Sequence, residues 1–128
     1  MSFQTYIPLI ARIFLTVIFL RSGITKLLSL SGTQETIANA GIPLPAVALT
    51  LTILFEIVGA VLVILGFKAR WGALLLLLFI IPATLVFHNP VTTPEETTQF
   101  FKNLSIMGGL LLVISYGSGP LSLSKAQD

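Results

Sequence analysis

The chain has 128 residues, of which 55% are hydrophobic and 9% are charged, and its mean hydropathy is +0.99. Soluble domains carry about 25% charged residues, so this composition excludes a soluble globular protein. The formal net charge is +2, without the basic run that nucleic-acid binding requires, and the absence of cysteine excludes disulfides, dithiol redox centres and thiolate ligation of zinc or iron–sulfur clusters.

Four apolar segments are long enough to cross a bilayer, which takes about 17 to 25 residues in a helix. They cover residues 6–28, 46–66, 71–87 and 100–116. The connections between them are short, which makes consecutive helices antiparallel. We therefore expect an all-α integral membrane protein that forms an antiparallel four-transmembrane-helix bundle. Residues 1–128 are expected to make up a single domain.

Shorter features separate these spans. Residues 1–7 contain no Lys or Arg, unlike the start of a signal peptide, so we expect the first span to be a retained membrane helix. In the first loop, residues 33–39 are expected to form a short interfacial helix. Residues 66–70 form a tight cationic turn. Pro82 predicts a kink in the third span, and His88-Asn89-Pro90 ends that span.

The basic residues are divided unevenly between the two sides of the membrane. With four spans, the two termini share a side with the turn at residues 66–70. That side carries Arg12, Lys68, Arg70 and Lys125, whereas the other carries Arg21, Lys26 and Lys102. By the positive-inside rule, we expect both termini to lie in the cytoplasm.

Glu56 lies in the middle of the second span. A charged side chain at a helix centre costs about 2.5 to 3.5 kcal/mol, so Glu56 should be neutral or paired. Arg12 and Arg21 on the first span each lie within about 6 Å of its depth, but nine residues separate them, so they point to opposite faces. We favour Arg12 as the partner. The pair would act either as a buried lock between helices or as the polar lining of a ligand site or proton path.

The face of the first span that carries Arg12 and the face of the second span that carries Glu56 both contain small residues, which permit close helix approach. The first face comprises Arg12, Thr16, Phe19, Gly23 and Lys26, and the second comprises Thr52, Glu56, Gly59, Val63 and Gly66.

A second polar group falls at the helix ends on the non-cytoplasmic side. It consists of Lys26, His88, Asn89, Lys102 and Asn103. The group could bind an anion, a quinone oxygen or a lipid headgroup. The simpler interpretation is that the lysines are interfacial side chains and that the His-Asn-Pro run is a helix stop. One histidine and one central acid do not make a zinc or haem site, so we expect no metal.

Several separated segments together resemble the DoxX family of small bacterial four-helix membrane proteins. They are Ala11-Arg12, Phe19–Leu27, Gly41-Ile42-Pro43, Glu56–Gly59, Leu65-Gly66 with Arg70, Lys102–Leu104 and Gly119–Leu123. The resemblance covers nearly the whole chain, although Arg21 stands where the family usually has a hydrophobic or small residue. It implies a bacterial cytoplasmic membrane protein associated with redox systems, because the family name derives from a subunit of a thiosulfate:quinone oxidoreductase. It supplies no catalytic residue set, so enzymatic activity stays open.

Three functions fit these observations. The leading one is an accessory subunit of a membrane redox system that binds a quinone or another lipophilic ligand between its helices, with Glu56 and Arg12 as polar contacts. The second is a structural or assembly subunit of a larger membrane complex. The third is a small transporter or a homo-oligomeric channel. All three place the chain among membrane lipids, and none involves nucleic acid.

Overall fold

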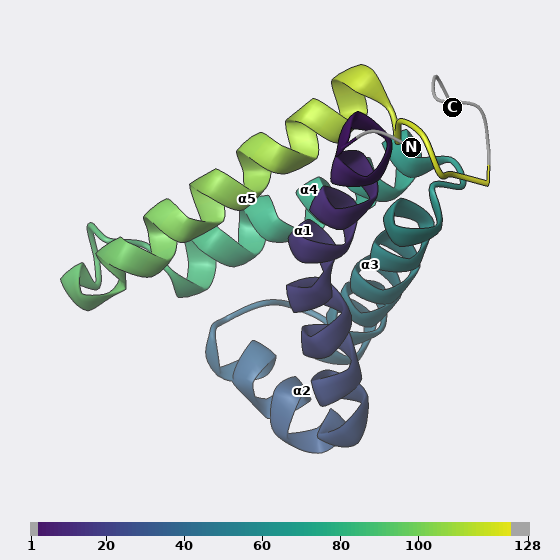
Figure 1. Cartoon of the computed structure of the whole chain (residues 1–128). Coiled ribbons are helices and arrows are strands. Elements are labelled where there is room, and N and C mark those ends of the chain that lie inside the picture. The colour runs from purple at the N-terminus through teal and green to yellow at the C-terminus, as the bar shows by residue number, and fades with distance from the viewer. Residues whose placement is uncertain (1–2, 124–128) are drawn as a thin grey trace.

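The computed structural model describes residues 3–123, which form helices and no strand (Figure 1). The long helices are α1 (Phe3–Leu28), α3 (Pro45–Leu65), α4 (Ala69–Phe87) and α5 (Thr97–Tyr116), and the short ones are α2 (Leu30–Asn39) and the 3-10 helix η1 (Pro94–Glu96). Four helices are long and apolar enough to cross a membrane. The predicted all-α membrane fold is therefore confirmed.

The helix ends follow local signals in the sequence. Pro45 occupies the first position of α3, where its missing N–H costs nothing. Gly66 ends α3 with a φ of 69°, which glycine adopts without steric penalty. The N–H of Gly66 donates to the carbonyl of Val63 at 3.2 Å, and that of Phe67 donates to the carbonyl of Leu62 at 3.1 Å. These two bonds make a Schellman motif, which turns the chain sharply into α4.

The four long helices pack in chain order and do not close into a ring. Contacts are extensive between α1 and α3, α3 and α4, and α4 and α5, whereas α1 and α5 touch over only a short stretch. Figure 1 shows the consequence: α1 and α3 run together toward α2, while α4 and α5 diverge from them toward the connection that holds η1. The bundle is therefore joined at one end and open at the other.

The buried core lies where the helix pairs meet. It comprises Phe19, Ala60, Val63, Ala73, Leu76, Ile80 and Leu110. The buried residues of α1 include Arg12, Thr16, Phe19 and Gly23, the face that the sequence predicted.

Two glycines bring α3 and α4 together. A Cβ on Gly59 would lie 2.9 Å from the carbonyl oxygen of Gly72, and a Cβ on Gly72 would lie 2.8 Å from that of Gly59. We expected the small residues on these faces to bring the second span against the first, but they mediate two different helix contacts. Gly59 faces α4, whereas Gly23 of α1 lies against Ile57 of α3.

The segment 117–123 crosses the joined end of the bundle. Arg12, which is 2% exposed, donates through Nη2 to the carbonyl oxygen of Leu121 at 2.7 Å. The N–H of Leu123 donates to the carbonyl oxygen of Leu65 at 3.1 Å. These bonds hold the segment against α1 and α3.

We predict that Gly59→Ala destabilises the protein and that Gly108→Ala does not. The new methyl group at position 59 would meet the backbone of Gly72, and such overpacking costs about 1–3 kcal/mol. At position 108 nothing lies within 4 Å of the added atom, so the higher helix propensity of alanine should dominate. Thermal unfolding in detergent measures both. Equal midpoints for the two variants would contradict the close α3–α4 contact.

Candidate functional site

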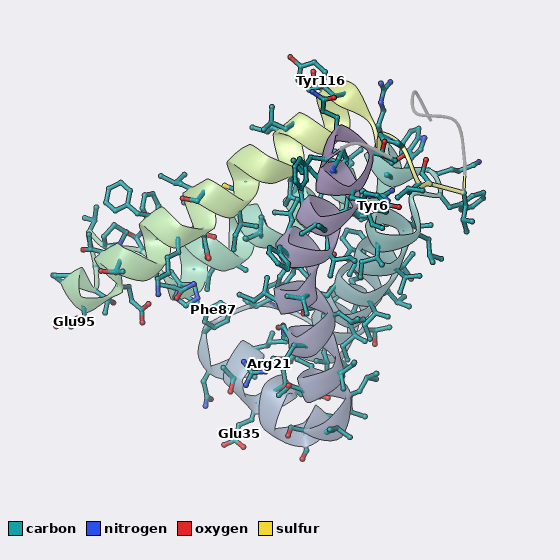
Figure 2. The ribbon with its side chains drawn as sticks, viewed as in Figure 1. Tyr6, Arg21, Glu35, Phe87, Glu95 and Tyr116 are labelled. Atoms are coloured by element: carbon teal, nitrogen blue, oxygen red, sulfur yellow. The ribbon has the colours of Figure 1, made fainter. Side chains whose placement is uncertain are left out.

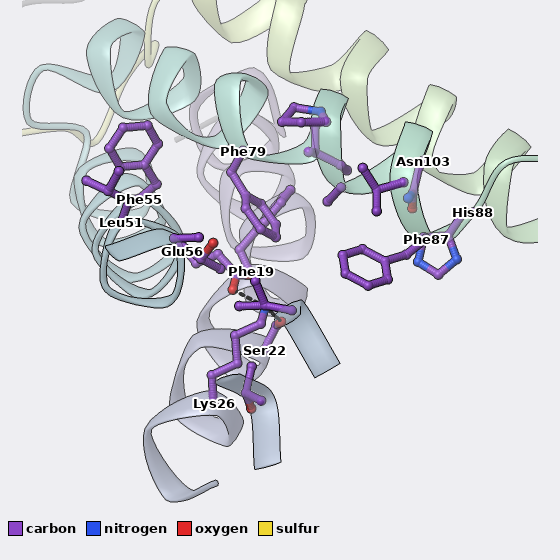
Figure 3. Close-up of a pocket in the computed structure, with 18 of the residues that line it drawn as sticks. Phe19, Ser22, Lys26, Leu51, Phe55, Glu56, Phe79, Phe87, His88 and Asn103 are labelled. Carbon is purple, nitrogen blue, oxygen red and sulfur yellow. Dashed lines mark hydrogen bonds and ion pairs between the residues drawn. The ribbon is translucent and has the colours of Figure 1, made fainter. Parts of the chain in front are cut away.

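A cavity of about 540 Å³ lies in the open part of the bundle, between the α1–α3 pair and the α4–α5 pair (Figure 3). We call it the cleft. Its walls are mainly apolar and include the aromatic side chains of Phe19, Phe55, Phe79 and Phe87. Its volume falls within the range of about 300–1,000 Å³ that is typical of small-molecule sites.

Glu56 and Lys26 form an ion pair on one wall of the cleft, with Lys26 Nζ donating to Glu56 Oε1. The Glu56 side chain is 1% exposed and that of Lys26 is 21% exposed. A carboxylate buried to this degree is stable only when it is paired and hydrogen-bonded, so Lys26 neutralises the acid that the second span carries.

Lys26 also contacts two other groups on this wall. Its Nζ donates to Ser22 Oγ at 2.9 Å and lies 4.9 Å from the centre of the Phe79 ring, a cation–π distance. Ser22 precedes Lys26 by one helical turn. Helical side chains tilt toward the N-terminus, so the lysine reaches back along α1 to Glu56 and Ser22.

The predicted pairing of Glu56 with Arg12 is wrong. Arg12 lies at the joined end of the bundle, where it binds the carbonyl of Leu121, and it does not line the cleft. The reason is the offset between the two helices along their axes. Glu56 of α3 lies beside Gly23 of α1, so the side chain of Lys26, about one turn further along α1, can reach the Glu56 carboxylate. Arg21 is exposed, as expected for the arginine that faces away.

The opposite wall carries a second polar group (Figure 3). Asn103 of α5 donates through Nδ2 to Thr84 Oγ1 of α4 at 2.9 Å, and Gln99 Nε2 donates to Asn103 Oδ1 at 2.9 Å. At the rim, His88 Nδ1 and Glu96 Oε2 are 2.7 Å apart. The bond between Asn103 and Thr84 ties α5 to α4, and the contact between His88 and Glu96 joins the end of α4 to η1. His88, Gln99 and Asn103 all line the cleft.

The structure thus rearranges the expected polar group at the helix ends. Lys26, His88 and Asn103 line the cleft together with Glu56, but Lys26 lies on the wall opposite His88 and Asn103. Lys102 is exposed on α5 and lies outside the cleft. Its position next to Asn103 places it about 100° further around the helix, so the two side chains point in different directions.

Sequence reasoning missed several cleft residues. Ser22 could have been found, because a residue four positions before Lys26 lies on the same helix face. Phe79, Phe87 and Gln99 carry no signal that separates them from lipid-facing or loop residues. Within residues 3–123, no three His, Cys, Asp or Glu side chains gather closely enough to hold a metal ion.

The family comparison matches the DoxX model over residues 7–89. The chain belongs to the DoxX family. The matched region runs from α1 to the end of α4, so this DoxX domain includes Lys26, Glu56 and His88, whereas Asn103 lies beyond the match.

Two relatives of this DoxX protein cover most of its length. It is 31% identical over 122 residues to the inner membrane protein YphA of Escherichia coli K12, across 91% of this chain and 87% of YphA. It is 32% identical over 117 residues to the inner membrane protein YqjF of the same organism, across 91% of this chain and 88% of YqjF. A Surfeit locus protein 4 homolog of Schizosaccharomyces pombe is 29% identical over 79 residues, across 56% of this chain and 26% of that protein. No solved structure was found to match the chain.

We predict that the destabilising effects of Lys26→Met and Glu56→Gln are strongly non-additive. Lys26→Met alone leaves a buried carboxylate without its cation, which should lower the unfolding midpoint more than Glu56→Gln does. The double variant should recover part of that loss, with a coupling of about 0.5–3 kcal/mol. A thermal double-mutant cycle in detergent tests this.

The matched controls are Lys102→Met and Glu95→Gln, which change the same residue types at exposed positions. Their effects should be small and additive. If the cycle at positions 26 and 56 were additive as well, the ion pair would not contribute to the fold.

Proposed function

We propose that this DoxX protein is an accessory component of a membrane redox system and that it holds a quinone or a related lipophilic molecule in the cleft. One observation carries the proposal: an apolar cleft between two helix pairs has the Lys26–Glu56 ion pair in its wall. Small-molecule sites usually combine many apolar groups with a few polar ones. The apolar walls supply affinity, and the polar groups fix the orientation of the ligand.

Lys26 is suited to bind a carbonyl oxygen of the ligand. Its ammonium group has three N–H donors, of which Glu56 and Ser22 accept two. The third has no hydrogen-bond acceptor among the described residues and is available to a ligand oxygen. Because Glu56 balances the charge of Lys26, a neutral ligand such as a quinone fits better than an anion.

The two walls of the cleft suit a flat ring with oxygens at both ends. Lys26 lies on one wall, and the side chains of His88 and Asn103 lie on the other. Phe19 and Phe79, whose rings meet edge to face with centres 6.3 Å apart, line the space between these walls. Aromatic side chains in this arrangement can stack on a bound ring.

A lipophilic ligand would enter the cleft from the bilayer. The limited contact between α1 and α5 leaves the cleft accessible from the side of the bundle. Since the chain contains no cysteine, electron transfer would reside in the ligand and in a partner protein. The redox assignment itself comes from the family, whose name derives from a subunit of a quinone-linked oxidoreductase.

We propose further that the protein resides in a bacterial cytoplasmic membrane with both termini in the cytoplasm. Two relatives carry the name inner membrane protein. Lys68 and Arg70 lie in or beside the α3–α4 turn, on the side where α1 begins, and short basic loops favour the cytoplasmic side.

We predict that protein purified from its native membrane in mild detergent retains a quinone-like molecule and that Glu56→Gln loses it. Removing the carboxylate frees Lys26 from its position at the cleft wall. Ala83→Phe should also abolish retention, because it fills the cleft from α4 and leaves the ion pair intact. Mass spectrometry of the eluate measures bound small molecules and co-purifying proteins.

Glu95→Gln is the matched control, since it removes an exposed carboxylate outside the cleft. It should retain the ligand at the level of the unaltered protein. A monodisperse protein with no bound lipophilic molecule would contradict the ligand site. A defined protein complex without such a molecule would favour the assembly-subunit function instead.

We predict that a membrane-impermeant maleimide labels Glu95→Cys in intact cells and labels Phe67→Cys only after lysis. Both positions are exposed, on opposite ends of α4, and the chain has no cysteine of its own. The reverse labelling pattern would show that the termini lie outside the cytoplasm.

A further inference from the structure

A second hollow, of about 520 Å³, lies between α1 and α2. We call it the α1–α2 groove. In contrast to the cleft, most of its lining residues are polar, and they include Arg21, Lys26 and five Ser and Thr side chains, among them Thr25, Ser29 and Thr33. None of the lining residues is acidic. The groove therefore offers hydroxyl donors and positive charge, without a carboxylate.

Arg21 supplies the uncompensated charge of the groove. The charge of Lys26 is balanced by Glu56, whereas Arg21 forms no ion pair or hydrogen bond with any residue between 3 and 123. Figure 2 shows Arg21 beside α2 and Glu35 on the far side of α2, pointing away from it. With one unpaired guanidinium and no acid, the groove is complementary to a single negative charge.

The position of Arg21 indicates that this anion belongs to the membrane. Arg21 precedes Leu28, the last residue of α1, by seven positions, so its Cα lies about 10 Å inside the end of the helix. A guanidinium at that depth is costly without a partner. Ile18, which lies closer to the bilayer centre than Arg21, lines the same groove and is 48% exposed, and Phe14, one turn further along the same face of α1, is 75% exposed. A ligand in the groove can therefore extend its apolar part along α1 into the bilayer.

We propose that the α1–α2 groove binds the phosphate of an anionic membrane phospholipid. Arg21 donates two parallel N–H bonds to phosphate oxygens, the geometry for which guanidinium is suited, and the Ser and Thr hydroxyls of α1 and α2 donate further bonds. The acyl chains follow the exposed apolar face of α1. Zwitterionic lipids bind less well, because the groove has no carboxylate for their ammonium group. This site does not depend on the ligand proposed for the cleft.

The test is native mass spectrometry of the delipidated full chain, with phosphatidylglycerol or phosphatidylcholine of identical acyl chains added at equal concentration. We expect one phosphatidylglycerol adduct at several-fold higher occupancy than the phosphatidylcholine adduct. Arg21→Gln should lower phosphatidylglycerol affinity roughly tenfold, because a hydrogen bond to a charged group contributes at least that factor. Lys102→Gln, which removes an exposed cation outside the groove, should leave it unchanged.

Each alternative outcome overturns the assignment. Equal binding of the two lipids, or unchanged phosphatidylglycerol binding in Arg21→Gln, would exclude an anionic headgroup at Arg21. Displacement of the lipid by millimolar inorganic phosphate would show that the groove takes a free phosphate ion and not a lipid. Because Arg21 is exposed and makes no intramolecular bond among the described residues, its replacement should not impair folding, which a monodisperse elution profile checks. Arg21→Gln should also retain the cleft ligand, so the two proposals fail or stand separately.

Discussion

A carboxylate inside a bilayer-spanning helix must have a partner, and the arrangement of α1 against α3 meets that requirement. Glu56 is buried near the middle of α3, and Lys26 reaches it from the last turn of α1. The ion pair is possible because Gly23 lets α1 approach α3 at the level of Ile57. Removing Lys26 would leave the buried Glu56 carboxylate without a counter-charge, so this contact favours the observed register of the two helices.

The open shape of the bundle follows from where its close contacts occur. Gly59 and Gly72 bring α3 and α4 together backbone to backbone near the joined end, and segment 117–123 covers that end through Arg12. Toward the other end, α4 is tied to α5 through Thr84 and Asn103, while α1 is tied to α3 through Lys26 and Glu56. Each pair is thus cross-linked internally, and the space between the pairs remains as the cleft.

Lys26 links the two hollows of the molecule. It lines both the cleft and the α1–α2 groove. Ser22 and Thr33 also line both hollows. The two hollows nevertheless differ in charge. In the cleft, the charges of Lys26 and Glu56 cancel, which favours a neutral ligand. In the groove, the charge of Arg21 is not balanced by an acidic lining residue, which favours an anionic ligand. One short stretch of α1 therefore presents two different chemical surfaces.

The length of the apolar segments and the Gly and Pro residues that end them determined the four membrane helices and the buried face of α1 that runs through Arg12, Thr16 and Phe19. The sequence also predicted a short helix at residues 33–39, which in the structure begins three residues earlier, as α2 (Leu30–Asn39). These are local properties, because hydropathy, helical period and Gly or Pro at helix ends act within one segment. The partner of Glu56 was decided only by the tertiary structure. Helical rise places a residue relative to the ends of its own helix, but the offset between two helices and the reach of a lysine side chain depend on how their surfaces interlock. The cleft was likewise decided by the tertiary structure. It exists because α1 and α5 do not pack against each other along their length, and the sequence pattern of a single helix does not show which other helix it fails to contact.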